Sequence, residues 1–174
     1  MTIPRRRLAA ALLLAASAAL VRAAEPPTLR IPGVADRTIS PSSLLGRGRM
    51  DVAVEASEGD TVVYHGLPLL EVLEKAGLDT RTMVGQRKTA PAIVVVTARD
   101  GYTVAFSVGE LLMLRSDPRV FLVAETAAGP LPDNEGPVRL FVRGDRVRSS
   151  YGLKSVELRY ISRNAGAEPA KPKR

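Results

Sequence analysis

Apolar residues follow three patterns along this chain, and each pattern predicts a different kind of element. The clearest predicts a helix that begins at Pro68, because four apolar residues spaced i, i+3, i+4 and i+7 share one face of it: Leu69, Val72, Leu73 and Ala76. Gly77 follows, where helices commonly end in a residue with positive φ. Residues 92–98 form a nearly unbroken apolar, β-branched run, which is typical of a central strand buried on both faces.

Alternation of apolar and polar positions and short apolar runs predict the remaining strands. Together with the run above, the expected strands cover residues 29–31, 51–56, 61–64, 92–98, 102–106, 120–124, 138–142 and 155–161. Asp100-Gly101 is predicted to be the turn of a hairpin between two of them.

Two further short helices are expected because a serine stands where each would begin. Ser40 is predicted to cap residues 41–45, and Ser107 to cap a helix that runs to Leu114. Residues 79–91 have no strong period and are predicted to be a surface loop, and the Gly/Pro segment 128–137 a second loop. The sum predicts a single α+β domain with a mixed β-sheet and a few short helices.

The two ends of the chain differ in composition from its middle. Residues 1–23 have the pattern of a signal peptide, with three arginines ahead of an uncharged apolar run and small residues at the cleavage position. The run is shorter than the roughly 20 apolar residues that cross a bilayer, although a retained N-terminal anchor is the alternative. We therefore expect a protein of the periplasm or a secreted protein, exported by the general secretory or twin-arginine route, with no transmembrane segment after signal removal.

The net charge of +7 is concentrated at those ends. Residues 1–23 hold four arginines and no acid, and residues 163–174 hold four basic residues and one acid. The domain between them, residues 24–162, is close to neutral, and the tail of residues 163–174 is predicted to be a disordered basic end. Nucleic-acid binding is not expected, because it needs a clustered basic footprint with aromatic or groove-reading elements.

Side chains for common catalytic chemistry are scarce. The chain has no cysteine, which excludes a disulfide framework, and His65 is its single histidine, so no metal site is predicted. A Ser-His-Asp triad would need His65 as its base, and we interpret it instead as a surface or edge histidine. The acidic residues at 55–60, Asp133 and Glu135 are interpreted as solvated turn and loop carboxylates.

The arginines are better candidates for a binding site than the histidine and the acids. Arg139 and Arg143 are expected on one face of the strand 138–142, and further basic residues follow closely: Arg146, Arg148 and Lys154. Such a cluster suits a phosphate or carboxylate, because the planar guanidinium forms paired hydrogen bonds to these groups. The alternative is a solvated edge strand whose charges prevent pairing with other chains.

Three motifs follow one another in a recognisable order. They are Tyr64-x-Gly66-x-Pro68-Leu69-x-x-Val72-Leu73-x-x-Ala76-Gly77, then Asp100-Gly101-Tyr102 with Phe106-Ser107, then Glu135-Gly136-Pro137-Val138-Arg139-Leu140. In this order and spacing, the chain resembles the molybdopterin-binding domain of the sulfite oxidase family over most of residues 29–161. The resemblance implies that same fold, in a compact, exported bacterial form.

The resemblance also implies a set of cofactor-binding residues, namely Gly136, Arg139, Arg143 and Lys154. Two departures bear on activity. The family's molybdenum-binding cysteine corresponds to a position near Ala56 or Ser57, and the long excursion that follows it has shrunk to residues 58–60. A neutral serine replaces a soft thiolate poorly on this metal.

The sequence therefore leaves two hypotheses for the function. The favoured one is a degenerate, non-catalytic binding module or accessory protein that kept the fold without a cofactor and binds a small anionic ligand, or a periplasmic or membrane-associated partner protein. The alternative, implied by the resemblance, is a molybdopterin-dependent oxidoreductase or a subunit of one.

Overall fold

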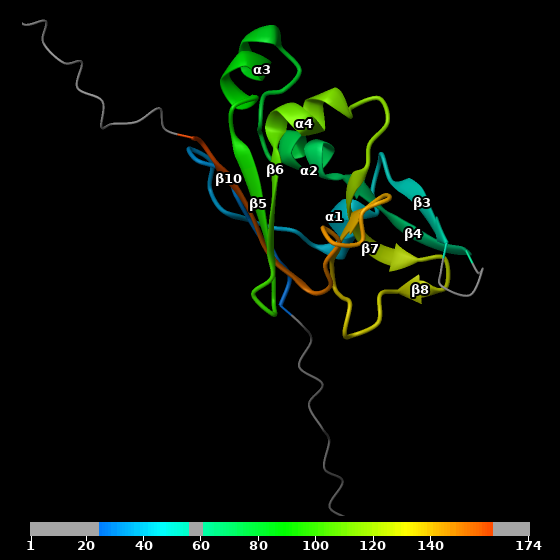
Figure 1. The fold of residues 1–174 in the computed structure, drawn as a ribbon. Coiled ribbons are helices and arrows are strands. Elements are labelled where there is room, and N and C mark those ends of the chain that lie inside the picture. The colour runs from blue at the N-terminus through cyan, green and yellow to red at the C-terminus, as the bar shows by residue number, and fades with distance from the viewer. Residues whose placement is uncertain (1–24, 56–60, 162–174) are drawn as a thin grey trace, which may run out of the picture.

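The computed structural model describes residues 25–55 and 61–161. Figure 1 shows their strands in two sheets, with α2, α3 and α4 gathered at one end. The strands are β1 Thr28–Arg30, β2 Arg37–Thr38, β3 Met50–Glu55, β4 Thr61–Pro68, β5 Ile93–Ala98, β6 Thr103–Ser107, β7 Val120–Thr126, β8 Gly129–Pro130, β9 Arg139–Val142 and β10 Leu153–Arg159. The helices are α1 Pro41–Leu44, α2 Leu69–Lys75, α3 Met83–Thr89 and α4 Val108–Met113.

The α+β class is confirmed, but the prediction of one mixed sheet is wrong. One sheet has the order β2-β1-β10-β5-β6 and is mixed, because β1 pairs with β10 in parallel. The other has the order β3-β4-β7-β8, with β9 also on β7, and its pairs are all antiparallel. Periodicity identifies strands and their buried faces, whereas sheet membership depends on long-range pairing that periodicity does not encode.

The main apolar core fills the space between the two sheets. It is formed by side chains from both sheets and the helices, and its largest fully buried members include Leu67, Leu69, Leu73, Val94, Phe106, Leu122 and Leu140. A second, smaller cluster lies on the opposite face of the second sheet: Val52, Phe121, Val123 and Phe141, with Met50 and Tyr64 against it. Both faces of β7 and β9 are therefore covered.

The predicted local signals at helix ends and turns are confirmed. The Ser40 Oγ accepts a hydrogen bond from the Ser43 N–H, and the Ser107 Oγ accepts one from the Glu110 N–H. Gly77 has a φ of 111° after α2, and Gly101 has a φ of 90° in the hairpin turn between β5 and β6. Short-range capping and turn geometry are encoded by adjacent residues, which is why the sequence predicts them well.

The prediction of a surface loop over residues 79–91 is wrong, because this segment contains the helix α3. The helix begins after Thr82, whose Oγ1 accepts a hydrogen bond from the Gly85 N–H at 3.0 Å. Its buried residues are Gly85 and Thr89, whereas Met83 is 70% exposed. A helix that buries two small or polar residues has no apolar stripe, so periodicity misses it.

Some strands differ in extent from the prediction. β4 continues through Gly66 to Pro68, and α2 begins one residue later than expected. β4 pairs with β7 on both sides of a bulge between His65 and Gly66, and a Cβ on Gly66 would stand 2.1 Å from the Leu122 carbonyl oxygen. This close approach of two backbones accounts for a glycine inside a strand.

No helix in the described ranges is long and apolar enough to cross a membrane.

Candidate functional site

A cleft with two adjacent chambers lies where α2 and α4 meet β7 and the end of β9. The inner chamber has a volume of about 200 Å³ and the outer one about 450 Å³. Leu114, Arg119 and Val120 line both chambers, so the two chambers are neighbours. The inner chamber is mostly apolar, with walls formed by Pro68, Leu70, Leu111, Leu114, Pro118 and Val120.

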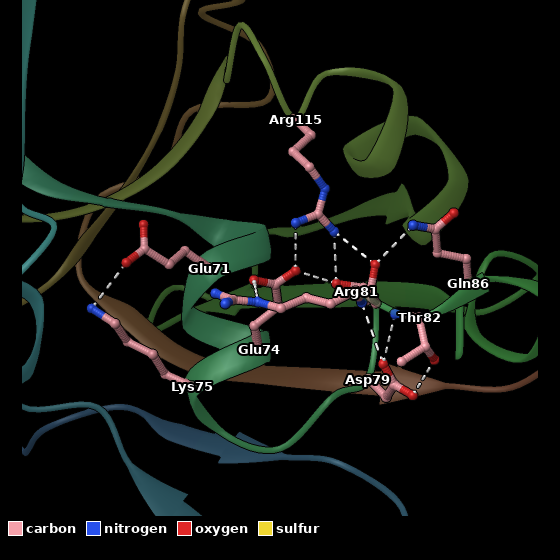
Figure 2. Close-up of polar contacts among 9 residues, drawn as sticks. Glu71, Glu74, Lys75, Asp79, Arg81, Thr82, Gln86 and Arg115 are labelled. Carbon is pink, nitrogen blue, oxygen red and sulfur yellow. Dashed lines mark hydrogen bonds and ion pairs between the residues drawn. The ribbon is translucent and has the colours of Figure 1, made fainter. Parts of the chain in front are cut away.

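Most charged groups of the inner chamber are paired within the chain, as Figure 2 shows: Arg81 and Arg115 with Glu74, and Glu71 with Lys75. The Glu74 side chain is 7% exposed and accepts hydrogen bonds from the Thr80 hydroxyl, from Arg81 Nε at 3.2 Å and from Arg115 at 2.8 Å. Arg115 also donates to the carbonyl oxygen and the hydroxyl of Thr80, both at 2.9 Å. The nearby Glu71 carboxylate is 3.1 Å from Lys75 Nζ.

Two opposing effects act on the pKa of Glu74. Burial raises it. Hydrogen bonds from Thr80, Arg115 and Arg81, together with the charge of Arg115, lower it by more, so the pKa lies below its ordinary value of 4.5. Glu74 is therefore ionised at neutral pH and joins α2 to the segments after α2 and α4. The arrangement is structural, because its partners are all supplied by the chain.

Arg148 in the outer chamber is also paired internally. Its Nε donates to Asp145 at 2.6 Å, a second nitrogen donates to Glu110 at 3.1 Å, and its guanidinium lies 5.1 Å from the centre of the Phe106 ring. Its hydrogen bond lowers the pKa of Asp145 and raises its own. These contacts tie the loop after β9 to α4.

Arg119 and Arg143 form the open part of the outer chamber. They lie opposite each other just beyond the paired residues Val120 and Val142, and the Arg143 N–H donates to the Arg119 carbonyl oxygen at 2.7 Å. Their side chains are 59% and 44% exposed. Like charges directly opposite on neighbouring strands repel each other, so this Arg119–Arg143 pair favours an anion between or beside the two guanidinium groups.

Asp117 supplies that negative charge in the structure. One of its carboxylate oxygens is 3.2 Å from an Arg143 guanidinium nitrogen, and the other is 3.9 Å from Arg119 Nε. The Asp117 side chain is 65% exposed, and ion pairs this exposed contribute at most about 1 kcal/mol. The Arg119–Arg143 pair thus accommodates a carboxylate, and the Asp117 carboxylate that lies beside it is weakly bound.

Arg139, predicted to be a ligand-binding residue or part of a solvated edge strand, is instead buried. All four residues of β9 are buried, and Arg139 is 8% exposed. It donates to the Tyr64 hydroxyl and to Glu135, both at 2.8 Å, and its guanidinium lies 4.1 Å from the Tyr151 ring centre and 5.0 Å from that of Tyr64. The interpretation as a solvated edge strand is wrong for Arg139, because the two tyrosines and Glu135 cover its side chain. Within the part of the chain that the structure describes, the Arg139 Nε has no hydrogen-bond partner.

The other two predicted residues lie elsewhere. The Gly136 carbonyl oxygen accepts a hydrogen bond from Arg99 at 3.1 Å, and the peptide bond between Gly136 and Pro137 is cis. Lys154 is exposed near the start of β10. Of the predicted set, Arg143 alone lines either chamber.

The predicted cofactor-binding residues do not come together in one binding site for a molybdopterin. Arg139 is occupied by Glu135 and two tyrosines, whereas Arg143 stands at the other end of β9 beside Asp117. The positions predicted to replace the cysteine, near Ala56 or Ser57, lie outside the described residues.

The histidine and the acids provide no further cluster. His65 Nδ1 is 2.8 Å from the Asp51 carboxylate, its strand partner on β3, and its side chain is 13% exposed. Among the side chains that the structure describes, no three of His, Asp or Glu stand close enough together to hold a metal ion.

Sequence reasoning missed Arg119 and Asp117. The signal that identifies them is the antiparallel pairing of β7 with β9, which sets Arg119 opposite Arg143. Their sequence separation gives no hint of this arrangement, since only the register of the two strands creates it. Arg148 and Arg143 were in the predicted basic cluster, and the structure places both in the outer chamber.

No protein-family model and no curated protein matches the chain. The membership of the sulfite oxidase family therefore stays a prediction from the motifs.

Proposed function

We propose that this protein is an exported, non-catalytic binding module whose ligand is a small carboxylate held by Arg119 and Arg143. The observation that carries the proposal is the exposed Arg119–Arg143 pair, which shares a single exposed carboxylate, that of Asp117. Arginine's fork of donors matches a carboxylate in two parallel hydrogen bonds, and this geometry gives such a site its selectivity.

The neighbouring arginines support this assignment by contrast. Arg115 and Arg148 each donate to two or more partners within the chain, and Arg139 is buried between two aromatic rings. A ligand gains little from Arg115 and Arg148, because they already donate to groups of the chain, and Arg139 is only 8% exposed. A ligand gains more from Arg119 and Arg143, because the carboxylate that it displaces belongs to a weak, exposed ion pair.

Export is the second part of the proposal. The basic, apolar and small-residue regions of residues 1–23 support a signal peptide, and a periplasmic or secreted location follows from it. A periplasmic or membrane-associated protein that presents a carboxylate to the same pair is the alternative partner.

The test is a titration of the mature protein with acetate, followed by isothermal calorimetry or NMR. We expect saturable binding that weakens about tenfold or more in Arg143→Ala and Arg119→Ala, because each removes a charge-assisted pair of hydrogen bonds. The matched control is Arg159→Ala, an arginine on β10 that is also 59% exposed and paired with a carboxylate, that of Glu157. Equal binding by all the variants, or no binding by the wild type, would overturn the proposal.

The molybdopterin-dependent oxidoreductase is the second candidate, and its support is the order of the motifs. We rank it second because the residues that the resemblance implies do not converge and the sequence has no cysteine. The measurement that separates the two is the molybdenum content of protein exported from a host able to make the cofactor. About one equivalent of molybdenum in folded protein would favour the enzyme.

A further inference from the structure

We propose that the ligand is a carboxylate with a short apolar chain, whose carboxylate binds the Arg119–Arg143 pair and whose chain enters the inner chamber. This inference rests on the proposed function, since it places the anionic group at the same pair. It adds the chemical class of the rest of the ligand.

The lining of the inner chamber is the first reason. Six of its residues present apolar surface, and they come from the end of β4, from α2, from α4 and the segment after it, and from the start of β7: Pro68, Leu70, Leu111, Leu114, Pro118 and Val120. Apolar walls with a few placed polar groups are typical of small-molecule sites.

The pairing of the polar groups in that chamber is the second reason. Glu74 accepts hydrogen bonds from Arg81 and Arg115, and Glu71 is paired with Lys75. Figure 2 shows these groups directed at one another. A polar ligand group would have to break this network to gain a partner, whereas an apolar chain loses nothing by lying against the apolar wall.

The residues that the two chambers share are the third reason. Arg119 lines both of them, and so do the apolar residues Leu114 and Val120. A ligand with its carboxylate at Arg119 therefore has the apolar side chains of the inner chamber next to that group. Charge at one end and apolar surface at the other select an amphipathic anion over a purely polar one such as phosphate.

The size of the effect follows from apolar burial. Each methylene removed from water strengthens binding by up to about fourfold, until the inner chamber is full. Affinity should then stop rising with chain length, because further methylenes stay in solvent.

The experiment is a titration of the mature protein with a homologous series: acetate, propionate, butyrate, pentanoate and hexanoate, with 1-hexanol as the uncharged comparison. We expect affinity to rise along the acids and to level off, and 1-hexanol to bind at least about tenfold more weakly than hexanoate because it lacks the charge. In Arg143→Ala, every acid should bind more weakly by a similar factor.

The chamber itself is tested with Leu114→Gln, which replaces a half-buried apolar wall residue with a polar one of similar length. This variant should lose most of the gain in affinity from propionate to hexanoate, measured relative to its own affinity for acetate. A thermal melt confirms that it is folded, and Leu112→Gln, a half-buried leucine on α4 that lines neither chamber, is the matched control.

The outcomes separate the two proposals. Acetate binding that depends on Arg143 but does not increase along the series overturns the apolar subsite and leaves the proposed function standing. An increase along the series that persists unchanged in Leu114→Gln also overturns the subsite. No binding of any acid overturns both.

Discussion

Arg139 and Arg143 stand at the two ends of β9, and they differ in burial and in the exposure of their carboxylate partners. Arg139 is 8% exposed, lies between two tyrosine rings and pairs with Glu135. Arg143 has a side chain that is 44% exposed, and its ionic partner is the exposed Asp117. The same residue type on one strand is a structural element in one place and a candidate ligand-binding group in the other.

A similar contrast separates the Glu74 carboxylate, which lines the inner chamber, from the Asp117 carboxylate beside the Arg119–Arg143 pair. Glu74 is 7% exposed and accepts hydrogen bonds from three side chains, whereas Asp117 is 65% exposed and touches its two arginines at 3.2 and 3.9 Å. What decides the role of a charged side chain is whether the chain itself already satisfies it. Groups satisfied in this way stabilise the fold, and those satisfied weakly remain available to a ligand.

The largest expected effect is on stability, in Arg139→Ala. This variant leaves the mostly buried Glu135 carboxylate without its partner and empties the space between Tyr64 and Tyr151. We expect the free energy of unfolding to fall by about 3 kcal/mol, measured by urea denaturation.

The comparison variant is Arg143→Ala, which should change the free energy of unfolding by no more than about 1 kcal/mol because its ion pair is exposed. Equal losses in the two variants would remove the distinction between the ends of β9.

A smaller loss of stability is expected on acidification, from Glu74. Its folded-state pKa lies below its ordinary value of 4.5, so its contribution to stability is complete above that pH and is lost as the pH falls through the folded-state pKa. Glu74→Gln should therefore be less stable than the wild type at pH 7, and the difference should shrink below pH 4.5. The check is urea denaturation of both proteins across that range, and a difference independent of pH would contradict it.

The smallest expected effect is a gain of affinity in Asp117→Asn. The substitution removes the carboxylate that competes for the Arg119–Arg143 pair, so acetate should bind up to about fivefold more tightly. Calorimetry measures the gain, and the matched control is Asp100→Asn in the hairpin turn, also an exposed aspartate but distant in the fold. Weaker acetate binding in Asp117→Asn would mean that Asp117 assists the ligand rather than competing with it.

The sequence predicts most local elements, and it does so where neighbouring residues encode them. The helix after Pro68, the serine caps and the turn at Gly101 all depend on residues a few positions apart. The helix α3 escaped prediction because its buried positions are Gly85 and Thr89, which give no apolar signal.

The site was predicted in part, and the missing part depends on pairing between distant strands. Arg143 was recognised from its cluster, but Arg119 acquires its meaning only through the register of β7 with β9. The burial of Arg139 likewise depends on Tyr64 from β4 and on Tyr151, which approach it only in the folded chain. Sequence pattern reveals which side chains are charged, and tertiary contacts decide which of them are free to bind.

The most direct test of the contrast between Arg139 and Arg143 is an NMR titration that follows the arginine Nε–H signals of the nitrogen-15-labelled mature protein as butyrate is added. The signals of Arg119 and Arg143 should shift together and saturate with one dissociation constant, while that of Arg139 stays in place. Each signal is assigned by its loss in the corresponding lysine variant. A shift of the Arg139 signal with the ligand, or no shift at Arg119 and Arg143, would contradict the account.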